Sequence, residues 1–187
     1  MMHQANPKTA ACYRPPMDAY TLIHRGPDRV GESPVWDEHL QALWWVDIES
    51  GLIRRWSMHS GSVQVWSLPE RVACIALAVD GRVIAALENR VVALRLHDGG
   101  GFDLTELSRV DHPLPGMRFN DGRCDAMGRL WVGTMVMDMA SNQAQGGLYV
   151  LDAQGLRGPL VSGLYTPNGM AFSPCLLYTS DAADDTP

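Results

Sequence analysis

The chain has 187 residues with 15 Lys or Arg and 21 Asp or Glu, which gives a formal net charge of −6. Hydrophobic residues make up 46% and charged residues 19%, so the composition excludes a largely disordered chain and predicts one folded domain with a buried core. Basic residues are scattered, and Arg54–Arg55 is the longest basic cluster, so we expect no nucleic-acid partner.

The N-terminal sixteen residues are polar and contain prolines, without the apolar stretch of a signal peptide. No apolar run approaches the roughly 18 residues of a membrane span, so no membrane partner is expected. The cysteines form neither a CxxC motif nor a Cys-His cluster, which disfavours a disulfide framework or a zinc site. We therefore expect a cytoplasmic protein with reduced thiols at Cys12, Cys74, Cys124 and Cys175.

Similar groups of short apolar runs recur along the chain, within residues 35–56, 78–94 and 123–152, and a further group begins at 170. The equivalent positions Asp37, Asp80, Asp125 and Ser173 are 43, 45 and 48 residues apart. A period of about 40–50 residues built from short strands is typical of a propeller. The sequence thus predicts an all-β β-propeller.

Turns are predicted between these strands where glycine follows a polar or flexible residue. No segment sustains the apolar spacing of an amphipathic helix, so no helix is expected. The predicted turns are at Asp80–Gly81, 98–101, Asp121–Gly122, Met127–Gly128, Gln154–Gly155 and Asn168–Gly169.

Glu32, just before the first predicted strand, is the first candidate for chemistry. One interpretation is an exposed loop residue, and the other is an oxygen ligand for a hard cation in the central channel of the propeller. Asn168 is open to the same alternatives, because Asn-Gly favours a hairpin turn whereas the amide oxygen can bind a metal.

Arg118 and Asn120 lie in the sequence Met117–Gly122, where Asn-Asp-Gly favours a tight turn with a neighbouring arginine. In an extended chain, however, residues two apart point to the same face. A guanidinium and an amide on one face can bind the hydroxyl and carbonyl groups of a polar ligand.

These segments together resemble the regucalcin (senescence marker protein) and gluconolactonase family, in family order and spacing from about Arg29 to Pro174. The matching segments are Gly-Glu-Ser-Pro-Val-Trp-Asp at 31–37, Trp-Trp-Val-Asp-Ile at 44–48, Arg-Phe-Asn-Asp-Gly at 118–122, Gly-Arg-Leu-Trp-Val-Gly-Thr-Met at 128–135, Gly-Gly-Leu-Tyr at 146–149 and Pro-Asn-Gly-Met-Ala-Phe-Ser-Pro at 167–174.

The resemblance implies a six-bladed propeller with one divalent metal ion, of which this chain would form an incomplete arc of about three to four blades. It implies that Glu32 and Asn168 bind the metal, and that Arg118 and Asn120 contact a sugar substrate. Asp138 falls where some relatives have a substrate-contacting Glu, which is one methylene longer. The general base implied by the family is an Asp in a later blade, and no residue of this chain is assigned to that role.

The implied reaction is metal-dependent hydrolysis of sugar lactones such as gluconolactone, with a small-molecule lactone as the partner. A dication can polarise the lactone carbonyl while a carboxylate takes the proton from water. Calcium is the first expectation, and zinc, manganese or magnesium are alternatives, because all accept oxygen ligands. The alternative function is a non-catalytic propeller that binds calcium or another ligand.

Three regions are expected along the chain. Residues 1–20 have no family match, residues 21–174 form the partial propeller, and residues 175–187 are a non-native tail. The tail is expected because Cys-Leu-Leu-Tyr-Thr-Ser-Asp-Ala-Ala-Asp at 175–184 resembles the translation of a transposase-type sequencing adapter; a natural strand at 176–179 is the alternative. Since no late-blade Asp is present, we expect the 187-residue chain to bind metal weakly and to be inactive or nearly so.

Overall fold

The computed structural model describes residues 21–173 and 179–181, and this part of the chain is built from strands without an α-helix. One short 3-10 turn, η2 (Met139–Ser141), follows β10. The first sheet has the order β1 (Gly31–Asp37), β2 (Ala42–Asp47), β3 (Leu52–Ser57) and β4 (Val63–Ser67). The second has β5 (Cys74–Leu77), β6 (Val83–Ala86), β7 (Arg90–Leu96) and β8 (Phe102–Arg109). The third has β9 (Met117–Cys124), β10 (Leu130–Val136), β11 (Gly146–Asp152) and β12 (Gly155–Leu164).

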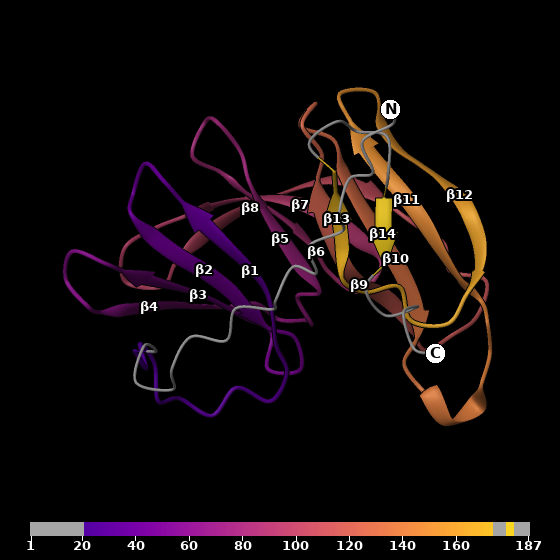
Figure 1. The fold of residues 1–187 in the computed structure, drawn as a ribbon, viewed down its shortest axis with the longest axis horizontal. Helices are drawn as coiled ribbons and strands as arrows, with labels where there is room; N and C mark the ends of the chain where they lie inside the picture. The colour runs from indigo at the N-terminus through magenta and orange to yellow at the C-terminus, as the bar shows by residue number, and fades with distance from the viewer. Residues whose placement is uncertain (1–20, 174–178, 182–187) are drawn as a thin grey trace, which may run out of the picture.

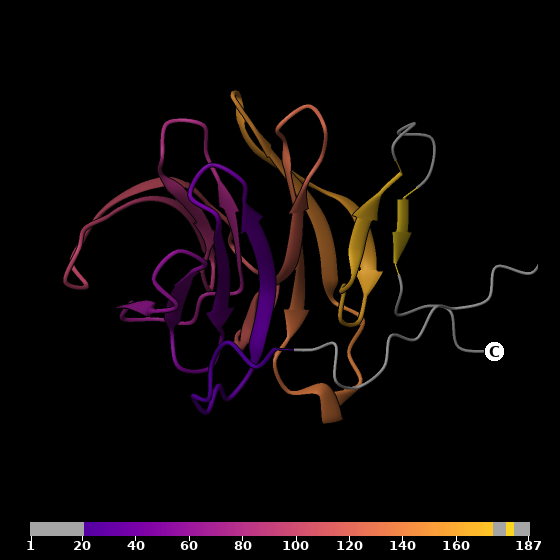
Figure 2. The same cartoon turned by 60° about the vertical axis from the view of Figure 1, so that its left-hand side comes forward.

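Each of these sheets is an antiparallel meander of four strands, here called blades 1, 2 and 3 in chain order. A fourth sheet pairs β13 (Met170–Phe172) with β14 (Thr179–Asp181). The blades stand side by side with their first strands near one another (Figures 1 and 2). The predicted β-propeller arc of three to four blades is thus confirmed.

Blade 2 is buried on both faces, which explains its uninterrupted apolar runs. Along β6, Val83 and Ala85 pack in the core between blades 1 and 2, whereas Ala86 packs in the core between blades 2 and 3. Successive side chains of a strand point to opposite faces, so each core receives alternate residues of the same strand. Full burial of a valine-sized side chain contributes roughly 1.5–3 kcal/mol, and these two cores therefore hold the blades together.

The antiparallel order also brings distant connections to one end of the arc. A first strand begins where the second strand of its blade ends. The first strands β1, β5, β9 and β13 contact one another in series. The segments that enter first strands and the segments that leave second strands therefore meet at one end, which we call the site end.

The turn predicted at Asp121–Gly122 is wrong, because both residues lie inside β9. The register of β9 on β10 shifts between Gly122, opposite Val132, and Phe119, opposite Thr134, which makes a β-bulge. A Cβ atom added to Gly122 would lie 2.7 Å from the carbonyl oxygen of Trp131 and 2.8 Å from Cys74 Sγ. Glycine is required here by close packing rather than by a turn.

Several expectations concern the two ends of the chain, most of which the structure does not describe. Residues 1–20 and most of 175–187 lie outside them, so the domain boundaries and the non-native origin of the tail stay predictions. Of the cysteines in the described part, Cys74 is buried and Cys124 is exposed, and both are free thiols. No helix in that part is long and apolar enough to cross a membrane.

Candidate functional site

The residues predicted for chemistry lie on segments that meet at the site end. Glu32 is the second residue of β1, and Arg118 is the second residue of β9. Asn168 is in the connection from β12 to β13, and Asp138 is two residues beyond the end of β10. Blade 1, blade 3 and the connection that enters the fourth sheet thus supply these side chains.

Arg118 and Asn120 form a buried hydrogen-bonded chain. Arg118 Nη1 donates to Asn120 Oδ1 at 2.8 Å and to the carbonyl oxygen of Phe119 at 2.7 Å. Asn120 Nδ2 donates in turn to the carbonyl oxygen of Pro167 at 2.9 Å, which ties blade 3 to the residue before Asn168. Arg118 is 8% exposed and Asn120 is 5% exposed. The geometry therefore places the guanidinium and the amide on the same side of β9.

The Arg118 guanidinium is buried without a carboxylate partner among the described residues, and its Nε atom has no hydrogen-bond partner there. Burial lowers the pKa of Arg118, and this effect is opposed at longer range by the charges of Glu49, Glu88 and Glu32. A desolvated guanidinium with unused donors binds a carbonyl, carboxylate or other oxygen-rich group strongly. Arg118 therefore keeps donors that are able to bind an oxygen-rich group.

Glu32 is exposed, and its carboxylate makes no hydrogen bond or ion pair to the described residues. The next residue, Ser33, has a φ of 53° and accepts a hydrogen bond from the backbone N–H of Ile75 at 3.0 Å through Oγ. This contact fixes an irregularity in β1 between Glu32 and Val35 against blade 2. The start of β1 thus holds an unpaired carboxylate at a defined position.

Asn168 is half-buried, and its Oδ1 accepts a hydrogen bond from the N–H of Gly169 at 2.8 Å. The Asn-Gly pair does not form a hairpin, because it connects blade 3 to β13. An amide oxygen and a carboxylate are hard oxygen donors and suit Ca²⁺ or a similar cation. The described residues contain no group of three or more His, Cys, Asp or Glu that could hold a metal, so Glu32 and Asn168 fit only as part of a ligand set.

Asp138 is exposed and caps η2, with Oδ1 accepting from the backbone N–H of Ala140 at 3.2 Å. It lines a cavity of about 230 Å³ together with polar side chains of Asn142, Gln143 and Thr166. No hydrogen bond joins Asp138 to Arg118 or Asn120 in the part of the chain that the structure describes. Its carboxylate is therefore near the site end but is not brought into the Arg118 chain.

Sequence reasoning missed an ion-pair cluster at the same end, formed by Glu49, Arg71 and Glu88 and called here the Arg71 cluster. Arg71 Nε donates to Glu49 Oε2 at 3.0 Å, and Nη1 donates to Glu88 Oε1 at 2.9 Å. A signal was present: Glu49, Glu88 and Asp138 each stand two residues after the second strand of their blade. This repeated acidic position could have been recognised from the sequence.

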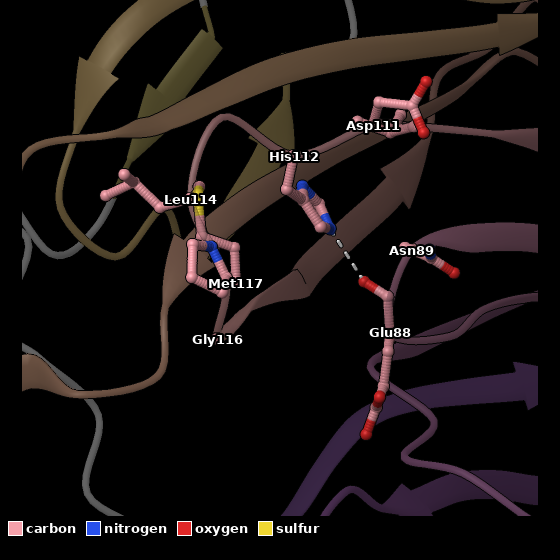
Figure 3. A pocket seen from close by; sticks show the side chains of 9 residues that line it. Glu88, Asn89, Asp111, His112, Leu114, Gly116 and Met117 are labelled. Carbon is pink, nitrogen blue, oxygen red and sulfur yellow. Dashed lines mark hydrogen bonds between the residues drawn. The ribbon is translucent and has the colours of Figure 1, made fainter.

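Glu88 also joins the cluster to β9 through its backbone. Its carbonyl oxygen accepts from the N–H of Phe119 at 2.9 Å. The same oxygen accepts from His112 Nε2 at 3.0 Å (Figure 3). Because a carbonyl only accepts, the proton of a neutral His112 is on Nε2. His112 and Met117 border a cavity of about 360 Å³ that Glu88 also lines. Phe119, which is next to Arg118, is thus hydrogen-bonded to Glu88, which pairs with Arg71.

Known proteins share the sequence pattern and the fold of this chain. The family model described as "SMP-30/Gluconolactonase/LRE-like region" matches residues 30–186. The chain is 36% identical over 153 residues to a 6-deoxy-6-sulfogluconolactonase of Pseudomonas putida, covering 81% of this chain and 50% of that protein. It is 36% identical over 146 residues to the pentonolactonase XacC of Haloferax volcanii, covering 78% and 46%.

Among solved structures, the chain is similar to a calcium-binding protein, regucalcin, from Agrobacterium tumefaciens. The TM-score is 0.75 with 26% identity, over 86% of this chain and 53% of that one. The chain spans about half the length of the curated relatives described above. With most of its length matched by the family model, the chain belongs to the SMP-30/gluconolactonase/LRE-like family.

Proposed function

We propose that the protein to which this chain belongs hydrolyses sugar lactones with the help of a divalent metal ion. The observation that supports this most is the buried Arg118 guanidinium, which has unused donors and is joined through Asn120 to the segment that holds Asn168. Relatives named as lactonases for both a six-carbon and a five-carbon sugar acid support the substrate class.

In this proposal Arg118 and Asn120 bind the oxygen atoms of the lactone and fix its orientation. Arg118 Nη2, which makes no hydrogen bond to the described residues, donates to a ligand oxygen, while Nη1 holds Asn120 in place. Glu32 and Asn168 would hold the metal as two of its oxygen ligands. When bound, the metal supplies Lewis-acid polarisation of the lactone carbonyl. Calcium is the first choice, since the donors are hard oxygens, and Mn²⁺, Mg²⁺ and Zn²⁺ are alternatives.

Asp138 is proposed as a weaker contributor on the substrate side. Its carboxylate is one methylene shorter than glutamate and already caps η2, so it reaches less far toward Arg118. Replacing it by glutamate should therefore improve substrate binding modestly. The proposed role fails if Asp138→Glu and Asp138→Asn both leave KM unchanged.

A non-catalytic propeller that binds calcium or a small ligand is the second candidate. It is favoured by one observation: the similar solved structure from Agrobacterium tumefaciens is described as a calcium-binding protein. The described residues hold no group of three His, Cys, Asp or Glu that could bind a metal, so we expect weak metal binding and little turnover from the 187-residue chain itself. The two candidates differ in whether a bound lactone is opened.

The test measures hydrolysis of D-glucono-1,5-lactone in a pH-stat, for the 187-residue chain and for the product of the source gene, sequenced without interruption across codon 174. Purified proteins are stripped with EDTA and reloaded with Ca²⁺, Mn²⁺, Mg²⁺ or Zn²⁺. We expect metal-dependent turnover by the product of the source gene, reduced at least about a hundredfold in Glu32→Gln and unaffected in the distant Arg82→Met. Turnover that survives both EDTA and Glu32→Gln would refute the metal mechanism. Calcium binding without turnover would select the second candidate.

A further inference from the structure

The Arg71 cluster brings together three separate connections at the site end. Glu49 is between β2 and β3, Arg71 is between β4 and β5, and Glu88 is between β6 and β7. The side chains are 32%, 36% and 37% exposed, respectively, so solvent or a ligand can reach them. An exposed ion pair contributes little to stability, typically below about 1 kcal/mol. Stability alone therefore gives little reason for placing these charges together.

Each member of the cluster keeps unused hydrogen-bonding capacity. Glu49 and Glu88 each bind Arg71 through a single carboxylate oxygen. Glu49 Oε1, Glu88 Oε2 and Arg71 Nη2 make no hydrogen bond to the residues that the structure describes. A cavity of about 230 Å³ opens beside them, lined also by Ser50 and Glu70. Two acceptors and one donor thus border the same small polar space.

This space is adjacent to the Arg118 chain. The carbonyl oxygen of Glu88 accepts from the N–H of Phe119, the residue between Arg118 and Asn120. The charges of Glu49, Glu88 and Arg71 all act on Arg118, which places the cluster within electrostatic range of it. A ligand held by Arg118 at one end can therefore extend toward the Arg71 cluster.

We propose that the Arg71 cluster is a second sugar-hydroxyl subsite. In this proposal Arg71 selects substrates by their tail, which is the part of the sugar farthest from the lactone carbonyl. The inference rests on the proposed function, since it places the lactone carbonyl on the Arg118 side and the remote hydroxyl groups at Arg71. A sugar hydroxyl both donates and accepts, so neighbouring hydroxyls can donate to Glu49 and Glu88 while accepting from Arg71.

The net charge of the cluster limits which substrate tails it can bind. Two carboxylates and one guanidinium give a net charge of −1, which repels a phosphate or sulfonate. The subsite should therefore prefer a neutral, hydroxylated tail. A six-carbon aldonate reaches the cluster with one more hydroxyl than a five-carbon aldonate, so tail length becomes a measurable determinant of affinity.

The experiment uses the 187-residue chain and three stable aldonates that differ only in the tail: D-gluconate, D-xylonate and 6-phosphogluconate. Dissociation constants are measured by calorimetry, and the arginine Nε–Hε signals are followed by NMR after assignment with single variants. We expect D-gluconate to bind about tenfold more tightly than either other ligand, and to shift the signals of both Arg71 and Arg118. Arg71→Met should abolish the preference and leave D-xylonate affinity within about twofold.

Two variants serve as references. Arg82→Met removes an arginine of similar exposure, 39%, paired with Asp80 at the opposite end of blade 2, and should keep the full preference. Arg71→Lys keeps the charge but not the fork of donors, and should give an intermediate preference. If Arg71→Met does not fold, Glu88→Gln provides the same test, because it removes the cluster's net negative charge and should raise 6-phosphogluconate affinity.

The outcomes separate the subsite from the proposed function. A shift of Arg118 without Arg71, equal losses for all three ligands in Arg71→Met, or tightest binding of 6-phosphogluconate would each overturn the subsite alone. A shift of Arg71 without Arg118 would support a hydroxyl-binding site but contradict the proposed lactone site. If D-gluconate shifts neither arginine, both proposals are wrong.

Discussion

Two charged residues at opposite ends of β9 are both buried, but only one of them has hydrogen-bond partners that stabilise its charge. Asp125, the residue after β9, accepts hydrogen bonds from the backbone N–H groups of Met127 and Arg129 and from the side chains of Arg129 and Trp131. Arg118, at the start of β9, has neutral partners only and an unsatisfied Nε atom.

The pKa shifts express this difference. Burial acts to raise the pKa of Asp125, but the hydrogen bonds from Trp131 and Arg129 outweigh it and lower the pKa to about 2. Burial lowers the pKa of Arg118, because nothing in contact with it compensates fully for lost hydration. The charged form is thus stabilised at one end and destabilised at the other. Under the proposed function, we expect the far end of β9 to serve stability and the site end to serve a ligand.

Removing the Asp125 carboxylate should have the largest effect on stability. Asp125→Ala leaves two backbone N–H groups and the Trp131 indole without an acceptor, and we expect a loss of about 3 kcal/mol in the free energy of unfolding. Urea denaturation followed by tryptophan fluorescence measures it. Asp37→Ala is the matched control, because Asp37 holds the same position in blade 1 but binds only two exposed backbone N–H groups. The control should lose no more than about 1 kcal/mol; equal losses would contradict a special role for Asp125.

The same residue predicts a dependence of stability on pH. A carboxyl whose folded pKa is lower than its unfolded pKa of 3.8 stabilises the protein above pH 4, and this contribution is lost as pH falls from about 4 toward 2. Urea midpoints measured between pH 6 and pH 2 should therefore decrease in the acid range. Asp47, Asp80 and Glu106 also have lowered pKa values, so Asp125→Asn should remove part of the decrease and not all of it. An unchanged acid slope in Asp125→Asn would be the opposite result.

Gly122, between the two ends, should have an intermediate effect. Its added Cβ atom would meet backbone Trp131 and buried Cys74, so Gly122→Ala forces blade 2 and blade 3 apart locally. We expect a loss of about 2 kcal/mol in the free energy of unfolding, measured by the same denaturation. Gly101→Ala, where the nearest atom is 3.9 Å away in His97, should change it by less than about 0.5 kcal/mol. Indistinguishable midpoints for the two variants would mean that the blades adapt to the added methyl.

The blade repeat was predictable because strand composition and turn residues are local properties. Asp37, Asp80 and Asp125 recur at blade spacing, and in the structure each accepts at least one backbone N–H group in the turn after a first strand. The period of two along an extended chain likewise predicted that Arg118 and Asn120 share a face. Local sequence patterns could not identify side chains that contact each other from different blades.

The missed features depend on such partners. Asp121–Gly122 has the composition of a turn, and only the close approach of Cys74 and Trp131 shows why it lies in a strand. Arg71 is a single arginine in a connection. Its ion-pair partners, Glu49 and Glu88, are 22 residues before and 17 residues after it in the sequence. Asp138 was placed near the site by resemblance, but its use as the cap of η2 follows from the local backbone.

Replacing Arg118 should have the smallest effect on stability and a large effect on binding. Arg118→Met exchanges a poorly compensated guanidinium for an apolar side chain of similar length. Asn120 Oδ1 loses its donor, but removal of the desolvated charge offsets this loss. We expect the free energy of unfolding to stay within about 1 kcal/mol of the unaltered chain, while the dissociation constant for D-gluconate rises at least about tenfold. Arg129→Met is the matched control: it removes a more exposed arginine, but one that donates to Asp125 at 2.6 Å, and should cost more stability without affecting D-gluconate. If Arg118→Met were the more destabilising of the two, Arg118 would be a structural residue, and the division of β9 into a stabilising end and a ligand-binding end would be wrong.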